Sequence, residues 1–206
     1  MWRLKKAEGT TRPMYENVDG LQNRIGGNEK LQKCKDLVDE LEVDLLAINE
    51  HKIRLGHKLN RNGLNQMFNG GETETRSVMG GNTHEKGGLK VQQGGTGMFL
   101  YGGLIDQYDF EASGKDTAGL GRWVHMVLQG EDGIKTRFVC GYNPCPSGKK
   151  ATKSSYQQHR RYFIRKEKDR TCPRTRFRQD LIRQLVQWRK EGDRLVVCLD
   201  ANCNIY

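Results

Sequence analysis

The sequence is short of the features that mark membrane and secreted proteins. It contains no apolar run of about 18 residues, so we predict no membrane-spanning helix. Residues 1–8 contain no apolar stretch of signal-peptide length, so we expect an intracellular protein, nuclear or cytoplasmic, whose six cysteines are reduced. Proline is scarce (4 residues) and glycine abundant (25). This composition favours short strands and many turns over a helical bundle.

The length of the chain predicts one domain. A chain of 206 residues is long enough to bury a core, and neither a repeat nor a linker divides it. We expect a disordered tail over residues 1–13 and a single domain over residues 14–206. Cys140-x4-Cys145 and Cys198-x4-Cys203 are spaced too widely for most zinc sites, so we interpret these cysteines as core thiols.

The spacing of apolar residues predicts an alternation of helices and strands. Two helices are expected, one capped by Asn28 and running to about residue 42, and one over residues 175–190 that Gly192 ends. A turn at residues 130–133 between two apolar runs predicts a hairpin. Residues 56–95 are polar and rich in glycine and read mainly as loop. The expected strands cover residues 15–21, 44–49, 64–68, 97–101, 123–128, 136–141 and 195–199.

The net charge of +10 is concentrated in one segment. Residues 149–190 contain 15 lysines and arginines against 3 acidic residues, whereas the rest of the chain has 20 basic and 22 acidic residues. Such a run is often no more than a solvated surface. Because aromatic residues are interleaved here, we favour a surface that binds polyanions. The candidate nucleic-acid contacts are Lys149, Lys150, Lys153, Arg160, Arg161 and Arg165.

Polar side chains follow four of the predicted strands. Hard cations such as Mg²⁺ bind carboxylate oxygens, and a phosphate under attack is stabilised by amide and hydroxyl donors. Carboxylates, amides and a tyrosine at strand ends therefore suit metal-assisted hydrolysis of a phosphodiester. Taken singly, an acidic residue after a strand is more often a turn former or a helix cap. The residues are Asn17 with Asp19, then Glu50, then Tyr142 with Asn143, and lastly Asp200 with Asn202.

The order of these blocks resembles the endonuclease/exonuclease/phosphatase superfamily, which has the DNase I-like fold. Residues 17–21 (Asn-Val-Asp-Gly-Leu) and 44–52 (Asp-Leu-Leu-Ala-Ile-Asn-Glu-His-Lys) are similar to the opening of that family. Residues 121–123, 141–144 and 200–202 follow in the family's order, so the resemblance runs from about Met14 to the C-terminus. It is closest to AP endonucleases and to the endonuclease domains of non-LTR retrotransposons. The resemblance implies an α/β fold, a four-layer α/β/β/α sandwich.

The same resemblance implies a role for each strand-end residue. Glu50 would be the main ligand of Mg²⁺, with Mn²⁺ as an alternative ion, and Asp19 would assist near the metal. The substrate would be duplex DNA, bound largely through its backbone, and the full-length element could carry a reverse transcriptase. Asn17 and Asn202 would bind the scissile phosphate. Tyr142 would contact the phosphate or the leaving oxygen, and Asp200 would orient or activate the attacking water.

The sequence also departs from the family. Leu199 stands where the family usually has glycine, and Asn49 where it usually has glutamine. The closing Ser-Asp-His motif is absent, so we expect a C-terminally truncated domain that is weakly active or inactive. Of the histidines, only His51 follows a candidate site residue directly. Two alternatives remain open. One is a catalytically silent relict that binds nucleic acid, and the other is the same fold acting on a phospholipid or inositol phosphate.

Overall fold

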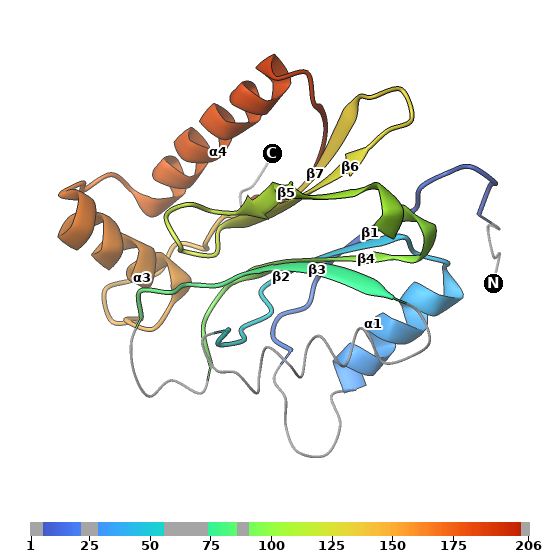
Figure 1. Cartoon of the computed structure of the whole chain (residues 1–206). Coiled ribbons are helices and arrows are strands. Elements are labelled where there is room, and N and C mark those ends of the chain that lie inside the picture. Colours follow the sequence, from blue (N-terminus) through green and yellow to red (C-terminus); the bar gives the residue numbers. More distant parts are fainter. Residues whose placement is uncertain (1–5, 22–28, 56–73, 86–90, 203–206) are drawn as a thin grey trace.

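The computed structural model describes residues 6–21, 29–55, 74–85 and 91–202. Within them the chain forms two four-stranded sheets stacked face to face, with helices on both outer faces (Figure 1). The first sheet has the order β1-β2-β4-β3, with β1 Pro13–Asn17, β2 Leu45–Asn49, β3 Thr75–Gly80 and β4 Thr96–Tyr101. The second has the order β5-β6-β7-β8, with β5 Tyr108–Lys115, β6 Trp123–Gln129, β7 Lys135–Tyr142 and β8 Arg194–Asp200.

The helices complete the predicted four layers. Helix α1 (Glu29–Glu40) lies against the first sheet, and α4 (Pro173–Lys190) lies against the second (Figure 1). The chain passes from β7 to β8 through α3 (Ser155–Tyr162), a π-helical turn η2 (Phe163–Glu167) and α4. A 3-10 helix, η1 (Gly102–Gln107), joins β4 to β5. No helix of the described residues is long and apolar enough to span a bilayer. The fold class expected from the sequence is confirmed.

The side chains of β2 point alternately to the two faces of the first sheet and fill the space on both sides of it. All five of its residues are buried. Leu46 and Ile48 pack into the layer between this sheet and α1, whereas Leu45 and Ala47 pack into the layer between the two sheets. Successive side chains of a strand point to opposite faces, so a strand buried on both faces is apolar throughout. The outermost apolar layer joins α4 to the second sheet through Phe177, Leu181, Trp188, Trp123 and Val139.

Three elements were not predicted, and each lacks the apolar pattern that prediction relies on. Strand β3 lies within the expected loop of residues 56–95 and, among the described residues, pairs with β4 alone, at a sheet edge. Strand β5 is also an edge strand and contains a register shift. Helix α3 buries polar side chains, among them Gln158, which accepts from Asn82, and His159, whose Nε2 lies 3.2 Å from the carbonyl of Leu120. The expected strand at 64–68 and the expected cap at Asn28 lie outside the described residues.

The two ends of the expected strand over residues 15–21 differ from the prediction. The strand begins at Pro13 and stops at Asn17, after which the backbone leaves β1. The amides of Gly20 and Leu21 then donate to the carbonyls of Glu50 and His51. In the expected tail, the amide of Arg12 donates to Asp44 at 2.7 Å and Lys6 pairs with the same carboxylate at 2.5 Å. The turn after β1 therefore lies against the turn after β2.

Candidate active site

The polar strand ends meet where the two sheets join. Strands β1 and β2 are parallel, with Asn17 opposite Asn49, and β7 and β8 are parallel, with Tyr142 opposite Asp200. Asn17 Nδ2 donates to Asp200 Oδ2 at 2.8 Å, and Asn49 Nδ2 donates to the carbonyl of Gly141 at 2.8 Å. The structure therefore brings the ends of β1, β2, β7 and β8 together, although they lie far apart in the sequence.

Unusual backbone conformations concentrate at this cluster. In the described part of the chain, six residues other than glycine have positive φ, and four of them are Asp19, Glu50, Lys52 and Asn202. Left-handed conformations are uncommon for such residues and cost free energy, and they persist where the surrounding structure enforces them. Here the enforcement includes the hydrogen bonds from the amides of Glu50 and Lys52 to the carbonyls of Gly95 and Gly94.

The acidic part of the site is held by lysines. The Lys52 ammonium contacts the carboxylate of Asp19 and lies 3.5 Å from Glu50 Oε2. The hydrogen bond and the positive charge of Lys52 hold the pKa of Asp19 below its ordinary value. Lys30 adds hydrogen bonds to the carbonyls of Val18 and Asp19, at 3.1 and 3.3 Å. Lys52 was not predicted as a site residue, although it stands two positions after Glu50 in the block that carries the resemblance.

The part contributed by the second sheet is held by amides and backbone carbonyls, and by Arg174, which donates to the carbonyls of Ala201 and Asn202 at 3.3 and 2.6 Å. The amide N–H of Asn202 donates to Asp200 Oδ1 at 3.1 Å, and its side chain donates to the carbonyl of Asn143 at 2.7 Å. Asn143 donates in turn to the carbonyl of Ala201 at 2.9 Å. The exposed thiol of Cys145 lies 2.9 Å from Asn202 Oδ1, so the expectation of a core thiol is wrong at this position. Amides, backbone carbonyls and the Arg174 guanidinium therefore fix the loop after β8.

Tyr142 lies between the two parts. Its burial, followed by the nearby Glu50 carboxylate, raises the pKa of its hydroxyl far above the ordinary value. The hydroxyl therefore stays protonated at neutral pH and can donate a hydrogen bond. Ser155, the first residue of α3, also contacts it, so α3 begins beside the candidate site.

His51 does not face this site. Its ring is fully buried, with Nε2 3.0 Å from the carbonyl of Gly80 and Nδ1 accepting from the amide of Ile53 at 3.0 Å. Burial lowers its pKa to about 4, so the ring is neutral at pH 7. The other histidines of the described residues, His84, His125 and His159, contact groups elsewhere in the fold.

The expected nucleic-acid contacts lie on the connection that leaves the site. Lys149, Lys150 and Lys153 are exposed and lie between β7 and α3. Arg161 donates to Glu85 at 2.6 Å, so its charge is partly neutralised. Arg160 lies on α3 beside it, and Arg165 is exposed in η2. The exposed lysines begin seven residues after Tyr142, in the loop that leads from β7 to α3.

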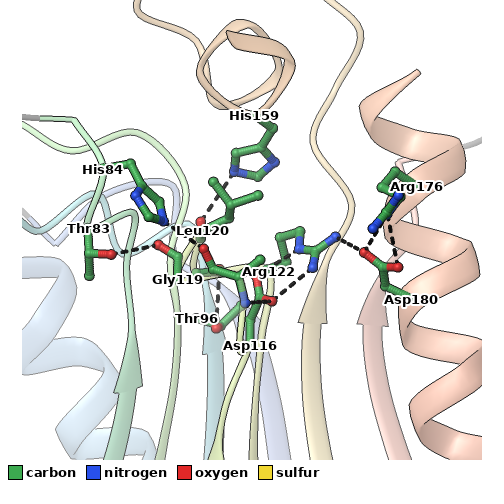
Figure 2. A network of polar contacts seen from close by, with 12 residues as sticks. Thr83, His84, Thr96, Asp116, Gly119, Leu120, Arg122, His159, Arg176 and Asp180 are labelled. Atoms are coloured by element: carbon green, nitrogen blue, oxygen red, sulfur yellow. Dashed lines mark hydrogen bonds and ion pairs between the residues drawn. The ribbon is translucent and has the colours of Figure 1, made fainter. Parts of the chain in front are cut away.

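A buried ionic network links the start of β6 to α4 (Figure 2). Arg122 donates to both carboxylate oxygens of Asp116, at 2.7 and 2.8 Å, and to Asp180 of α4 at 2.8 Å. Its guanidinium carbon lies 4.5 Å from the ring centroid of Trp123. The carbonyl of Arg122 accepts the amide of Tyr142 at 2.8 Å. This network therefore fixes α4 and the strand that presents Tyr142 against each other.

The donor set around Glu50 fits a hard divalent cation that also binds a phosphate. The described residues contain no group of three or more histidine, cysteine or acidic side chains arranged to hold a metal ion. Mg²⁺ commonly takes only one or two protein carboxylates and completes its shell with water and phosphate oxygens. Glu50 and Asp19, together with the Asn17 amide, match that requirement, and the Lys52 ammonium occupies the space between the two carboxylates.

Known sequences do not identify the chain. No protein-family model matches it, and no curated protein matches it. Solved structures, in contrast, do match the chain. The human Nocturnin catalytic domain with bound sulfate matches with a TM-score of 0.54 at 12% identity over 94% of this chain and 64% of that one. The 3′ phosphatase NExo from Neisseria, bound to product DNA hairpin, matches with a TM-score of 0.53 at 15% identity over 94% and 58%.

A third structure agrees with these two. The Xenopus laevis APE2 catalytic domain matches with a TM-score of 0.50 at 14% identity, over 93% of this chain and 58% of that one. The chain therefore spans about three fifths of the length of these structures. At such low identity the likeness shows the fold alone, which is the DNase I-like fold.

Proposed function

We propose that this chain is a Mg²⁺-dependent phosphodiesterase domain that nicks duplex DNA, an endonuclease of the retroelement type. The observation that carries the proposal is the hydrogen bond between Asn17 and Asp200, which joins the two sheets beside Glu50 and Tyr142. That bond assembles carboxylates, amides and a protonated tyrosine on one rim, as cleavage of a phosphodiester requires. The fold shared with a 3′ phosphatase whose structure holds a product DNA hairpin supports the same class of substrate.

Each residue has a task that its surroundings support. Glu50 and Asp19 would hold Mg²⁺, or Mn²⁺ in its place, and the ion would supply positive charge to the phosphate oxygens. The protonated hydroxyl of Tyr142 would donate to the phosphate or to the leaving oxygen. Asp200 would orient the attacking water. Asn17 and Asn202 would bind the phosphate, which requires exchange of the intramolecular hydrogen bonds that their amides now make.

We expect slow cleavage. Among the described residues every imidazole contacts groups elsewhere in the fold, so none is placed to transfer a proton at the rim. A positioned general acid or base contributes about 10²–10⁴-fold in rate. Cleavage by this chain would therefore depend on electrostatic stabilisation by the metal and the rim groups, at a rate lower by about that factor than that of a site with a histidine.

Conversion of supercoiled plasmid to the nicked circle tests the proposal. Nicking should require Mg²⁺ or Mn²⁺ and should disappear in the Glu50→Ala variant. The matched control is Glu131→Ala in the exposed hairpin turn, which should leave the rate unchanged. If the wild-type chain nicks no plasmid at any Mg²⁺ or Mn²⁺ concentration while its circular dichroism spectrum is native, the endonuclease proposal is wrong.

A second candidate function is binding of nucleic acid without cleavage. The exposed lysines at positions 149, 150 and 153 favour it, because phosphate contacts need only positive charge. Such non-specific binding typically has a Kd of about 10⁻⁴–10⁻⁶ M near physiological salt and weakens steeply as salt rises. Binding to duplex DNA that changes little between 50 and 200 mM salt, on the order of twofold or less, would exclude this surface.

A further inference from the structure

A cavity lies between the loop that joins β5 to β6, the turn η2 and one flank of α4. Its volume is about 510 Å³, within the range of about 300–1,000 Å³ that small-molecule sites have. None of the described residues that line it belongs to the candidate active site. We name this cavity the α4 pocket. The lining residues that give it its chemistry are aromatic, amide and guanidinium groups: Trp123, Tyr162, Gln184, Arg122, Arg176 and Arg183.

The carboxylates that line the α4 pocket are paired with arginines. Asp180 accepts from Arg122 at 2.8 Å and from Arg176 at 3.0 Å. Figure 2 shows the Asp180 carboxylate between these two guanidinium groups. Glu167 pairs with Arg176 at 2.9 Å. Because a nearby cation offsets each negative charge, the two carboxylates oppose the entry of an anion only weakly.

Arg183 is the most loosely held of the three arginines in the pocket. Its side chain is 76% exposed, against 2% for Arg122 and 28% for Arg176. Its Nη1 lies 3.5 Å from Asp180 Oδ1, which is longer than a good hydrogen bond. A guanidinium presents a planar fork of donors that fits two oxygens of a phosphate. Arg183 can therefore turn to a phosphate without breaking a bond on which the fold depends.

Tyr162 supplies an aromatic surface whose position is fixed. Its ring packs against His84, with the two centroids 4.4 Å apart, and edge-on against Phe163 at 5.6 Å. A ring that is already ordered loses little entropy when a base stacks on it. From α4, Gln184 lines the same pocket with an amide that has two donors and an acceptor, as the polar edge of a base requires. The pocket thus combines a stacking surface, an amide and an available cation.

We propose that the α4 pocket binds a nucleotide, with its base stacked on Tyr162 and its phosphate on Arg183. Aromatic rings that stack with bases, together with cations that contact phosphates, are the groups by which proteins bind single-stranded nucleic acid without sequence preference. A free nucleoside monophosphate and one nucleotide of a single strand present the same base and phosphate, so the pocket fits both. The proposal does not rest on nuclease activity, because the pocket lies outside the candidate active site.

The probe is 2-aminopurine deoxyriboside 5′-monophosphate, whose fluorescence is quenched when its base stacks on an aromatic ring. Titration with the whole chain in EDTA should quench the probe to saturation. The deoxyriboside without the phosphate should bind about tenfold more weakly, since it lacks the charged hydrogen bonds to Arg183. EDTA removes divalent ions, so neither cleavage nor a metal-bound phosphate contributes. Glu50→Ala should bind the probe like the wild type, which separates this pocket from the proposed endonuclease site.

A single-stranded oligonucleotide that contains one 2-aminopurine distinguishes the two sources of nucleotide. If the pocket takes a strand, this oligonucleotide should bind more tightly than the free nucleotide and should compete with it, because neighbouring phosphates add contacts. If the pocket takes a free nucleotide, the oligonucleotide should bind more weakly, whereas the quenching by the mononucleotide remains.

Two variants of α4 locate the phosphate. Arg183→Met should remove the advantage of the phosphate, so that nucleotide and nucleoside bind alike. Arg178→Met deletes the same charge at an exposed position of α4 that does not line the pocket, and it should keep the advantage. Tyr162→Leu should weaken binding of the nucleoside about fivefold or more, because the stacking surface is lost.

Three results would overturn the proposal. The first is equal binding of nucleotide and nucleoside by the wild-type chain. The second is an advantage of the phosphate that survives Arg183→Met. The third is the absence of quenching at millimolar concentrations of the wild-type chain. The first and third results need no variant, so the folding of a variant cannot obscure them.

Discussion

Two clusters in this molecule place one cation between two carboxylates, and they differ in burial and in the kind of cation. In the first, the Arg122 side chain is 2% exposed and its planar guanidinium donates to Asp116 and Asp180. In the second, the Lys52 ammonium contacts Asp19 and Glu50, and the Asp19 side chain is 70% exposed. A guanidinium carries a fixed fork of donors, whereas an ammonium is a compact charge on a flexible stem.

This difference in burial decides how easily the cation of each cluster can be displaced. The buried cluster is surrounded by protein and connects α4 to the second sheet (Figure 2), so its cation cannot leave without a large loss of stability. The cluster at the strand ends opens to solvent, so its cation can move aside for another one. Similar charges therefore stabilise the fold in one place, whereas in the other the proposed function requires a cation that can be exchanged.

The largest expected effect comes from removing the buried cation. Arg122→Met leaves the Asp116 carboxylate buried without its partner, so we expect the free energy of unfolding to fall by about 3–5 kcal/mol. Urea denaturation followed by circular dichroism measures it. The control is Arg183→Met, whose side chain is 76% exposed and lies 3.5 Å from Asp180, and which should cost about 0–1 kcal/mol. Similar losses for both variants would erase the contrast between buried and exposed ions.

Removing the partly buried cation of Lys52 should tighten metal binding. Lys52→Met deletes a positive charge that competes with a divalent ion for Asp19 and Glu50. A unit charge at about 4 Å is worth about 1–4 kcal/mol between water and a protein surface, so we expect Mn²⁺ to bind about tenfold tighter or more. Electron paramagnetic resonance of free Mn²⁺ measures this affinity. Lys135→Met, which breaks the Lys135–Asp109 pair on the second sheet, should leave it unchanged. An unchanged affinity in Lys52→Met would remove Lys52 from the cation site.

The same substitution should have little effect on the fold. Partly exposed ion pairs typically contribute about 0–1 kcal/mol, so the unfolding free energies of Lys52→Met and Lys135→Met should both stay within about 1 kcal/mol of the wild type. Urea denaturation at low ionic strength is the most sensitive condition, because salt then screens these ion pairs least. A loss as large as that of Arg122→Met would show that the strand-end cluster is structural as well.

The smallest expected effect is a change in the pKa of Asp19. The pKa of Asp19 is lowered by Lys52, so the folded protein keeps this carboxylate ionised below the ordinary value of about 3.9. Its contribution to stability is therefore present above about pH 4 and is lost as pH falls through the lowered pKa. Carbon-13 NMR of the Asp19 carboxyl should show a midpoint below the ordinary value in the wild type. In Lys52→Met the midpoint should rise towards that value, and a midpoint that stays put would assign the shift to another cause.

Elements with a strong apolar pattern could be predicted from the sequence, and those built at edges or from polar contacts could not. Strands β2 and β4, the hairpin of β6 and β7, and α4 follow their apolar residues closely. Strand β3 escaped prediction because an edge strand buries less of its surface. Helix α3 escaped because Gln158 and His159 are buried by hydrogen bonds to Asn82 and to the carbonyl of Leu120.

The candidate site shows the same division. Glu50, Tyr142 and Asp200 could be placed because each stands at or just after the end of a predicted strand, and parallel strands present their ends on one rim. The place of Lys52 in the site could not be predicted, because its contact with Glu50 depends on a left-handed backbone at both residues.

The hydrogen bond between Asn17 and Asp200 also determines at which stage of folding the strand ends can meet. It joins residues separated by 183 positions, and neither sheet alone contains both partners. Contacts between such distant residues form late, because the chain loses loop entropy before they repay it. A molecule that has formed either sheet but has not stacked the two would therefore possess no rim at all. Completion of the fold is therefore the event that brings the strand ends of the candidate site together.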